Sequence, residues 1–282
     1  MKNAFFKYIL ALLLFGSNGV VASYIDLNSY EIVLLRTLIG SLLLIGIFLI
    51  SGGKLTFYQN KKDFAFLAVS GIAMGTSWMF LYEAYAQIGV CIASLCYYCG
   101  PVIVMILSPL IFKERLTKAK VMGFLVVLIG IFLVNGQGGV IKNQWGLACG
   151  LASAVMYAFM VVFNKKATAI TGLENSALQL FIAFLSVAIF VGIKQGFAVK
   201  IPEDSVLPVV ILGLINTGFG CYLYFSSIGK ISVQTVAIYG YLEPLSAVLF
   251  SVFFLHETML PLQILGAVLI IGGAIFGECF KK

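Results

Sequence analysis

Charged side chains are scarce in this sequence. Asp, Glu, Lys and Arg make up 10% of its 282 residues, whereas apolar residues make up 61%. A typical soluble domain carries about 25% charged residues, so the composition excludes an ordinary water-soluble fold. The regular alternation of polar and apolar residues that marks the strands of a membrane β-barrel is also absent. The apolar residues come in blocks close to the ~20 residues that a helix needs to cross a bilayer. We therefore expect an all-α membrane protein.

The sequence has a single histidine and lacks a nucleotide-binding motif. His256 is the single histidine, and no Ser/His/Asp triad or set of metal ligands can be assembled around it. The sequence contains no GxxxxGK[ST] motif, so the chain itself does not hydrolyse ATP. Its CxxC pair, Cys96 and Cys99, lies inside an apolar block and is interpreted as two small residues on one helical face. We expect no enzyme activity, no cofactor and no bound metal.

Ten apolar blocks, separated by Gly, Pro or charged residues, predict ten transmembrane helices. The blocks cover residues 5–23, 28–50, 64–87, 90–112, 119–134, 145–163, 176–193, 207–228, 231–255 and 260–276. The connection between the third and fourth blocks is so short that it predicts a tight antiparallel hairpin. The first block resembles a secretory signal peptide. Its removal would leave nine helices and break the internal repeat, so we expect it to be retained.

The basic residues predict how the helices are oriented, because Lys and Arg are enriched on the cytoplasmic side of membrane proteins. With the N-terminus inside, fourteen of the eighteen basic residues fall in inner segments; Lys142, Lys194 and Lys200 fall in outer segments, and Arg36 lies within a span. The basic residues form no continuous face for nucleic acid. We expect an integral protein of a bacterial plasma membrane with both termini in the cytoplasm.

The sequence contains an internal repeat. The stretch that begins at Pro101 aligns with the stretch that begins at Pro244 at a constant offset. Further pairs match at this offset: Glu114 with Glu257, Gly123 with Gly266, and Gly130 with Gly273. We therefore expect two five-helix repeats, residues 1–140 and 141–282. Because five is odd, the second repeat enters the membrane from the other side, and such inverted repeats suit a carrier. Duplication for packing alone is the alternative.

The ordered motifs of both halves resemble the EamA family of the drug/metabolite transporter superfamily. In the first half they are FGSN at residues 15–18, Arg36, YEAYAQIG at 82–89, and KERLT after Pro101. In the second half they are YLYFSSIG at 222–229, YLEP at 241–244 and HET at 256–258. The resemblance covers nearly the whole chain. It implies ten helices in two inverted repeats around a central substrate cavity, alternating access, and export or exchange of small molecules.

Three ionisable residues within predicted spans are candidates for transport, since a charge near the bilayer centre costs about 2.5 to 3.5 kcal/mol on insertion scales. Glu83 is either a proton-coupling or cation-binding carboxylate, or a structural partner of Arg36. Arg36 lies in the same half of the membrane and is more readily interpreted as structural than as a substrate contact. Glu243 is either a substrate-facing or coupling carboxylate, or an acid that hydrogen-bonds to a neighbouring helix.

Two prolines and several aromatic or amide side chains complete the candidate set. Pro101 and Pro244 remove a backbone donor within predicted spans, where a helix can kink and expose polar backbone to a cavity, so both are candidate hinges. Aromatic residues that could line a cavity or pack between helices are Trp78, Tyr82, Tyr97, Tyr98, Tyr239 and Tyr241. The amides of Asn18 and Asn216 are further candidates, either for substrate binding or for interhelical hydrogen bonds.

The sequence as a whole favours a secondary active transporter. We expect it to move small polar or amphipathic metabolites, such as amino acids or related compounds, outward by alternating access. Proton or ion coupling, exchange or the solute gradient would supply the driving force. An intramembrane enzyme and a non-transporting scaffold are the alternatives. The lipid bilayer and a small-molecule substrate are the expected partners, and the sequence leaves open whether the protein is a monomer or a homodimer.

Overall fold

A computed structural model describes residues 2–97, 99–135, 143–255 and 261–279 of the chain. These residues form helices and turns, with no strand in the described ranges. The helices are α1 (Lys2–Gly16), α2 (Asn18–Ala22), α3 (Ser29–Ile50), α4 (Lys61–Tyr97), α5 (Gly100–Phe112), α6 (Lys118–Asn135), α7 (Gln144–Lys166), α8 (Gly172–Lys194), α9 (Glu203–Ile211), the π-helix η1 (Leu212–Phe219), α10 (Gly220–Ile228), α11 (Val233–Tyr239), α12 (Leu242–Leu255) and α13 (Pro261–Cys279).

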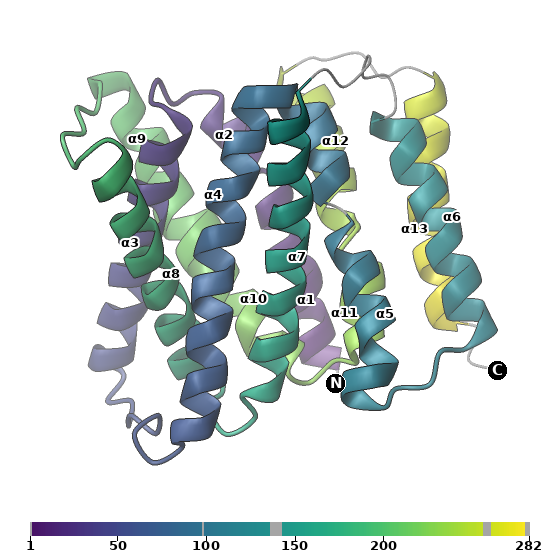
Figure 1. The fold of residues 1–282 in the computed structure, drawn as a ribbon, viewed down its shortest axis with the longest axis horizontal. Helices are drawn as coiled ribbons and strands as arrows, with labels where there is room; N and C mark the ends of the chain where they lie inside the picture. Colours follow the sequence, from purple (N-terminus) through teal and green to yellow (C-terminus); the bar gives the residue numbers. More distant parts are fainter. Residues whose placement is uncertain (1, 98, 136–142, 256–260, 280–282) are drawn as a thin grey trace.

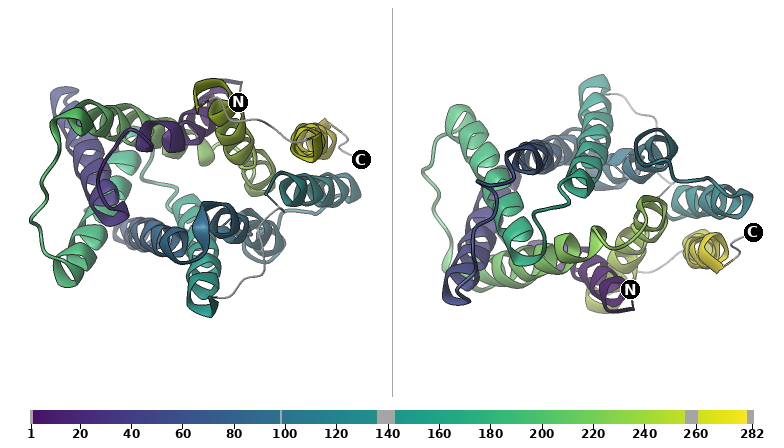
Figure 2. Two further views of the ribbon diagram at one scale, coloured as in Figure 1. Left: turned by 90° about the horizontal axis from the view of Figure 1, so that it is seen from above. Right: turned by 90° about the horizontal axis from the view of Figure 1, so that it is seen from below.

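The spans run along one common direction (Figure 1), and the views from above and below show them arranged in a ring (Figure 2). Six spans are long and apolar enough to cross a bilayer unaided: Asn3–Ala22, Ser29–Ile50, Lys61–Tyr85, Gln144–Lys166, Gly172–Lys194 and Glu203–Ile228. The end of α4 with α5, the pair α11 and α12, and helices α6 and α13 provide the other four. This arrangement confirms the predicted all-α membrane fold with ten spans.

Equivalent helices of the two halves run antiparallel, as inverted repeats require. Helices α6 and α13 lie side by side at one edge of the molecule (Figure 2). A Cβ atom at Gly130 would lie 2.6 Å from the carbonyl oxygen of Gly266, and one at Gly273 would lie 2.6 Å from that of Gly123. These two contacts are reciprocal, since Gly123 and Gly130 match Gly266 and Gly273 in the repeat. The missing side chains let the two backbones touch.

The backbone stays helical through the predicted hairpin between the third and fourth spans. Helix α4 continues to Tyr97 and bends sharply near its upper end (Figure 1). A Cβ atom at Gly150 of α7 would approach the Cβ atoms of both Ala84 and Cys96, at 3.8 and 2.7 Å. The chain therefore turns back on itself, as predicted, but the predicted break in the helix is wrong. Close packing of both arms on α7 supports the continuous helical turn.

Four predicted spans are not continuous α-helices in the structure. The fourth is divided between α4, which ends at Tyr97, and α5, which begins at Gly100. The first breaks at Ser17, between α1 and α2, and the ninth breaks at Gly240 and Tyr241, before α12. The eighth changes from α to π geometry between Leu212 and Phe219. Irregular backbone at membrane depth is tolerated where it is buried in protein or lines a cavity, and Gly240 and Tyr241, at the break of the ninth span, are buried.

Basic residues gather at one end of the bundle, which we call the basic end and define by loops 51–60, 113–117, 167–171 and 229–232. Helix α1 begins and α13 ends there (Figure 1). The other end, with loops 23–28 and 195–202 and the bend of α4, is called the opposite end. Lys194 and Lys200 are its described basic residues. That the basic end faces the cytoplasm stays a prediction.

Candidate functional site

A cavity of about 740 Å³ lies inside the ring. Most of its described lining residues are apolar, aromatic or small: Phe15, Gly16, Asn18, Gly19, Val20, Ala22, Ser29, Arg36, Met74, Ser77, Trp78, Leu81, Tyr82, Tyr85, Tyr97, Tyr157, Met160, Cys221, Tyr224, Phe225, Glu243 and Ala247. Ala22 and Ser29 flank the loop 23–28, so the cavity extends to the opposite end. Its volume falls in the range of about 300–1,000 Å³ that is usual for small-molecule sites.

Arg36 lines this cavity although only 4% of the residue is exposed. Its Nε donates a 2.9 Å hydrogen bond to Oγ1 of Thr217, and its guanidinium carbon lies 4.7 Å from the ring centroid of Trp78. A cation over the face of a tryptophan ring is stabilised by the ring quadrupole. The hydrogen bond and the ring together fix the guanidinium between α3, α4 and η1.

Glu243 and Asn18 lie on a second wall, where the break between α1 and α2 packs against the start of α12. A Cβ atom at Gly16 would lie 2.9 Å from the carbonyl oxygen of Glu243, which shows how closely the two segments approach. The Glu243 carboxylate accepts no hydrogen bond from any described residue. Oδ1 of Asn18 is buried and likewise has no partner in the described ranges. This wall therefore offers hydrogen-bond acceptors to a ligand.

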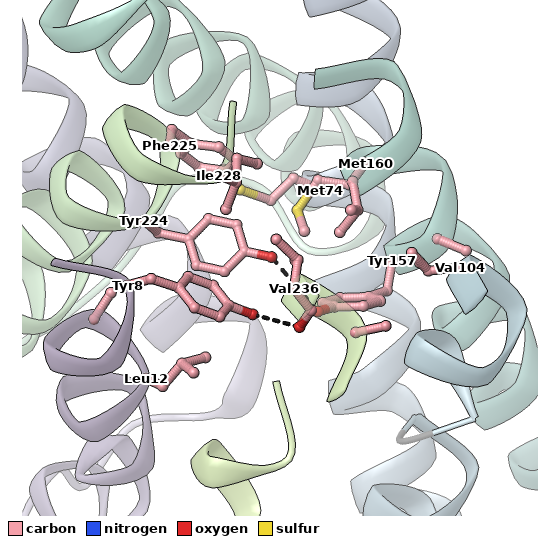
Figure 3. Packing of buried hydrophobic residues seen from close by; sticks show 14 of the residues in the cluster. Tyr8, Leu12, Met74, Val104, Tyr157, Met160, Tyr224, Phe225, Ile228 and Val236 are labelled. Carbon is pink, nitrogen blue, oxygen red and sulfur yellow. Dashed lines mark hydrogen bonds between the residues drawn. The ribbon is translucent and has the colours of Figure 1, made fainter. Parts of the chain in front are cut away.

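Tyrosines from several helices pack against one another beside the cavity, and Figure 3 labels Tyr8, Tyr157 and Tyr224. The hydroxyl oxygens of Tyr157 and Tyr224 are 3.5 Å apart, and Tyr97 packs edge-on against Tyr157 with ring centroids 5.4 Å apart. The hydroxyl of Tyr8 donates a 2.7 Å hydrogen bond to the carbonyl of Val236. These side chains are buried, and they belong to the main hydrophobic core.

At the basic end, two charged side chains form hydrogen bonds with backbone groups of other segments. The Glu114 carboxylate accepts hydrogen bonds from the backbone N–H groups of Val233 and Gln234, at 2.8 and 3.2 Å. Nζ of Lys165 donates to the backbone carbonyls of Ile228 and Ile231. A negative carboxylate thus lies at the N-terminus of α11, and a positive ammonium group lies at the C-terminal end of α10. Each charge is opposite to the partial charge of the helix dipole at that end, so both contacts are favourable.

The structure brings together about half of the candidate residues proposed from the sequence. Arg36, Glu243, Asn18, Trp78, Tyr82 and Tyr97 line the cavity. Whether they bind substrate stays a prediction.

Three other candidate residues lie away from the cavity. Tyr239 packs edge-on against Phe5, with ring centroids 4.7 Å apart, and Tyr241 is fully buried beside Phe124. Asn216 donates hydrogen bonds to the carbonyl of Leu14 and the hydroxyl of Ser17, and so braces the break in the first span. Tyr98 and His256 lie outside the described residues.

Glu83 does not pair with Arg36, so that part of the prediction is wrong. Its carboxylate instead forms an ion pair with Nζ of Lys194 at 3.0 Å. The reason is helical spacing: Trp78, Tyr82 and Tyr85 form the face of α4 that lines the cavity, and Glu83 is rotated onto the next face. There it lines a separate pocket of about 300 Å³ between α4, α7 and α8.

Breaks precede both predicted hinge prolines. Helix α5 begins at Gly100 with Pro101 in its first turn, and α12 begins at Leu242 with Pro244 in its first turn. The two breaks occupy equivalent places in the repeat, and proline favours the start of a helix because its missing N–H has no partner there. That these breaks act as hinges remains a prediction.

Several lining residues were not among the candidates, including Tyr157, Tyr224, Met160 and Cys221. The two tyrosines carry a signal that sequence reasoning could have used, because each places a hydroxyl in the middle of a predicted span. The methionine and the cysteine carry no such signal. In the described ranges, no group of three or more His, Cys, Asp or Glu residues could hold a metal ion.

Comparisons with known proteins agree with this architecture. A family model described as the EamA-like transporter family matches residues 3–136 and 144–276. The uncharacterized transporter YxxF of Bacillus subtilis is 26% identical over 282 aligned residues, covering 96% of this chain and 88% of YxxF. The uncharacterized inner membrane transporter YedA of Escherichia coli K12 is 25% identical, covering 76% of this chain and 70% of YedA. A crystal structure with 20% sequence identity superposes with a TM-score of 0.84 over 97% of both chains, which shows a shared fold.

Proposed function

This chain belongs to the EamA-like transporter family, and we propose that it is a secondary carrier that exports small polar or amphipathic metabolites, such as amino acids or related compounds. The central cavity is the observation that carries the proposal. It has the volume of a metabolite site, an aromatic lining and two charged side chains of opposite sign, Arg36 and Glu243. Aromatic faces suit the apolar part of an organic substrate, while the charges suit its polar groups.

We propose that transport works by alternating access, and two features of the architecture support this. The cavity extends to the opposite end, and we propose that the buried tyrosines Tyr157, Tyr224 and Tyr8 close it toward the basic end. If the basic end faces the cytoplasm, this is the outward-facing state of the cycle, from which an exporter releases its substrate. Two antiparallel repeats can exchange conformations to give the inward-facing state around the same site. Breaks before Pro101 and Pro244 would let the half-helices move.

Solute flux in proteoliposomes tests this function. Purified protein would be reconstituted and loaded with single amino acids, chosen by a thermal-shift screen in detergent, since a ligand that binds the folded state raises its melting temperature. A carrier should show saturable flux and counterflow, in which unlabelled substrate on one side drives labelled substrate to accumulate on that side. A scaffold would show neither. Chemical conversion of a stabilising ligand would instead indicate an enzyme, and imposed pH gradients would show whether protons are coupled.

A further inference from the structure

The guanidinium of Arg36 is fixed along one edge and free along the other. Nε is committed to Thr217 and the plane is stacked on Trp78. No described residue accepts a hydrogen bond from the two terminal nitrogens. Together they form the planar fork that binds a carboxylate through two parallel hydrogen bonds. A buried charge without an ionic partner is costly, so this arrangement is typical of a site that a ligand completes.

Thr217 owes its position to the π-helix. Its hydroxyl donates a 2.8 Å hydrogen bond to the carbonyl of Leu212, five residues earlier, and accepts the Nε hydrogen bond from Arg36. Single π-helical segments within α-helices occur frequently at functional sites. In the same segment a Cβ atom at Gly213 would lie 2.6 Å from Cβ of Ile39. The glycine therefore allows α3 to approach closely enough for Thr217 to reach Arg36.

The wall with Glu243 and Asn18 has the opposite character. It presents a carboxylate and a buried amide oxygen, both without hydrogen-bond donors among the described residues. Arg36 and Glu243 line the same cavity, and no ion pair within 4 Å joins them in the described part of the chain. The cavity thus places a donor fork and a set of acceptors within reach of one small ligand. Such a pair of subsites fits a molecule that carries both an anionic and a cationic group.

We infer that Arg36 anchors the carboxylate of a zwitterionic substrate, that Glu243 and Asn18 receive its ammonium group, and that Thr217 is a positioning residue that keeps the guanidinium aimed at the cavity. The inference rests on the proposed carrier function and narrows it, because a substrate must carry both charged groups. The methyl ester of an amino acid lacks the anionic group. The decarboxylated amine lacks it as well, and both analogues keep the amino group, so the two analogues test the Arg36 subsite.

The protein contains two tryptophans, which makes direct binding measurable. Replacing Trp145, which lies outside the cavity, with Phe leaves Trp78 beneath Arg36 as the fluorescent reporter. Each proteinogenic amino acid except tryptophan would be titrated into this variant in detergent, with melting temperature as a second readout. The best ligand would then be compared with its methyl ester and its amine. We expect both analogues to bind at least about tenfold more weakly. Equal binding of the ester, or no response to any amino acid in either readout, would overturn the inference.

Variants of Thr217 separate positioning from packing. Thr217→Val keeps the shape of the side chain but removes the hydroxyl, and Thr217→Ser keeps the hydroxyl. We expect the valine variant to bind the amino acid about tenfold more weakly while its affinity for the ester stays unchanged. The serine variant should bind like the parent. If the valine variant weakened acid and ester alike, Thr217 would be merely structural and the positioning role would be lost.

A second substitution keeps the test decisive if the valine variant does not fold. Arg36→Lys retains the charge but loses the planar fork, so the preference for acid over ester should shrink several-fold. An unchanged preference would contradict the anchor role. Failure of the carrier function gives a different result, because amino acids would then bind with this preference but show no counterflow. Counterflow of acid and ester at equal rates would keep the carrier and remove the carboxylate anchor.

Discussion

Glu243 is the acidic residue among the described side chains of the cavity lining, so its charge is the first to test. Glu243→Gln preserves the shape of the side chain and removes the charge. A hydrogen bond to a charged group contributes about 1.5–3 kcal/mol, so we expect flux in proteoliposomes to fall about tenfold or more. The melting temperature should stay close to that of the parent, because no described residue depends on this carboxylate for a hydrogen bond.

Glu83→Gln is the matched control, with the same chemical change outside the cavity. Its ion pair with Lys194 involves a lysine side chain that is 42% exposed, and exposed pairs contribute at most about 1 kcal/mol. We expect flux to change by less than about twofold under the same assay. Normal flux in Glu243→Gln together with lost flux in Glu83→Gln would reverse the assignment of the two carboxylates.

Individual site residues could be predicted from the sequence when their chemistry was unusual for a span. Arg36, Glu243 and Asn18 are polar groups within apolar blocks, and each of them lines the cavity. Tyrosines were harder, because the same side chain suits both packing and lining. Tyr241 packs in the core and Tyr157 faces the cavity. The difference depends on which helices meet, and a sequence pattern along one helix does not specify that.

At the scale of elements, the pairing of α6 with α13 depends on glycines at the contact. Gly273→Ala would place a methyl group 2.6 Å from the backbone oxygen of Gly123, so backbone atoms must shift. Overpacking of this kind typically costs about 1–3 kcal/mol, and we expect a lower melting temperature in detergent. The neighbouring Gly272 has no atom within 4 Å of its Cβ position. Gly272→Ala should therefore leave stability unchanged, and equal effects of both variants would contradict the close contact.

The contact of Glu114 with the start of α11 links an element of the first half to one of the second. Glu114→Gln keeps one acceptor oxygen but removes the charge that complements two backbone N–H groups. We expect the basic end to open more readily, because charged hydrogen bonds contribute about 1.5–3 kcal/mol. Val236 lies in α11, where its carbonyl oxygen accepts the Tyr8 hydrogen bond. A cysteine introduced at this position should then react faster with a maleimide in the Glu114→Gln variant than in the parent background. An unchanged rate would show that the contact does not hold this end closed.

The positions of the helical blocks could be predicted, whereas local departures from α geometry could not. The predicted block 28–50 matches α3, where Asn28 and Glu31 form a capping box that specifies the start. Near Gly89 the sequence suggested a break, yet the helix continues through the turn. The π-helix was not predicted either, and its Thr217 contacts Arg36 on another helix. Such contacts are invisible to a pattern read along one segment.

At the scale of the whole molecule, the direction of threading can be measured by labelling. In a cysteine-free background, single cysteines would replace the exposed residues Arg115, at the basic end, and Gln195, at the opposite end. Because basic loops are retained in the cytoplasm, an impermeant maleimide added to intact cells should label Gln195→Cys and spare Arg115→Cys. The reverse pattern would invert the proposed direction of export. Labelling of both positions from one side would contradict the two-sided topology.

The pair of helices at the edge of the ring has a consequence for the surrounding membrane. Helices α6 and α13 contain 18 and 19 residues, so at 1.5 Å per residue each is about 27–29 Å long, close to the hydrocarbon thickness of about 30 Å. Their side chains at Leu125, Phe132, Leu265 and Val268 are exposed. Since the glycine contacts bring the two backbones together, neither helix can readily tilt alone to relieve hydrophobic mismatch. Lipids with longer or shorter acyl chains should therefore shift α6 and α13 together, and this shift would strain the contacts of the pair with the rest of the ring.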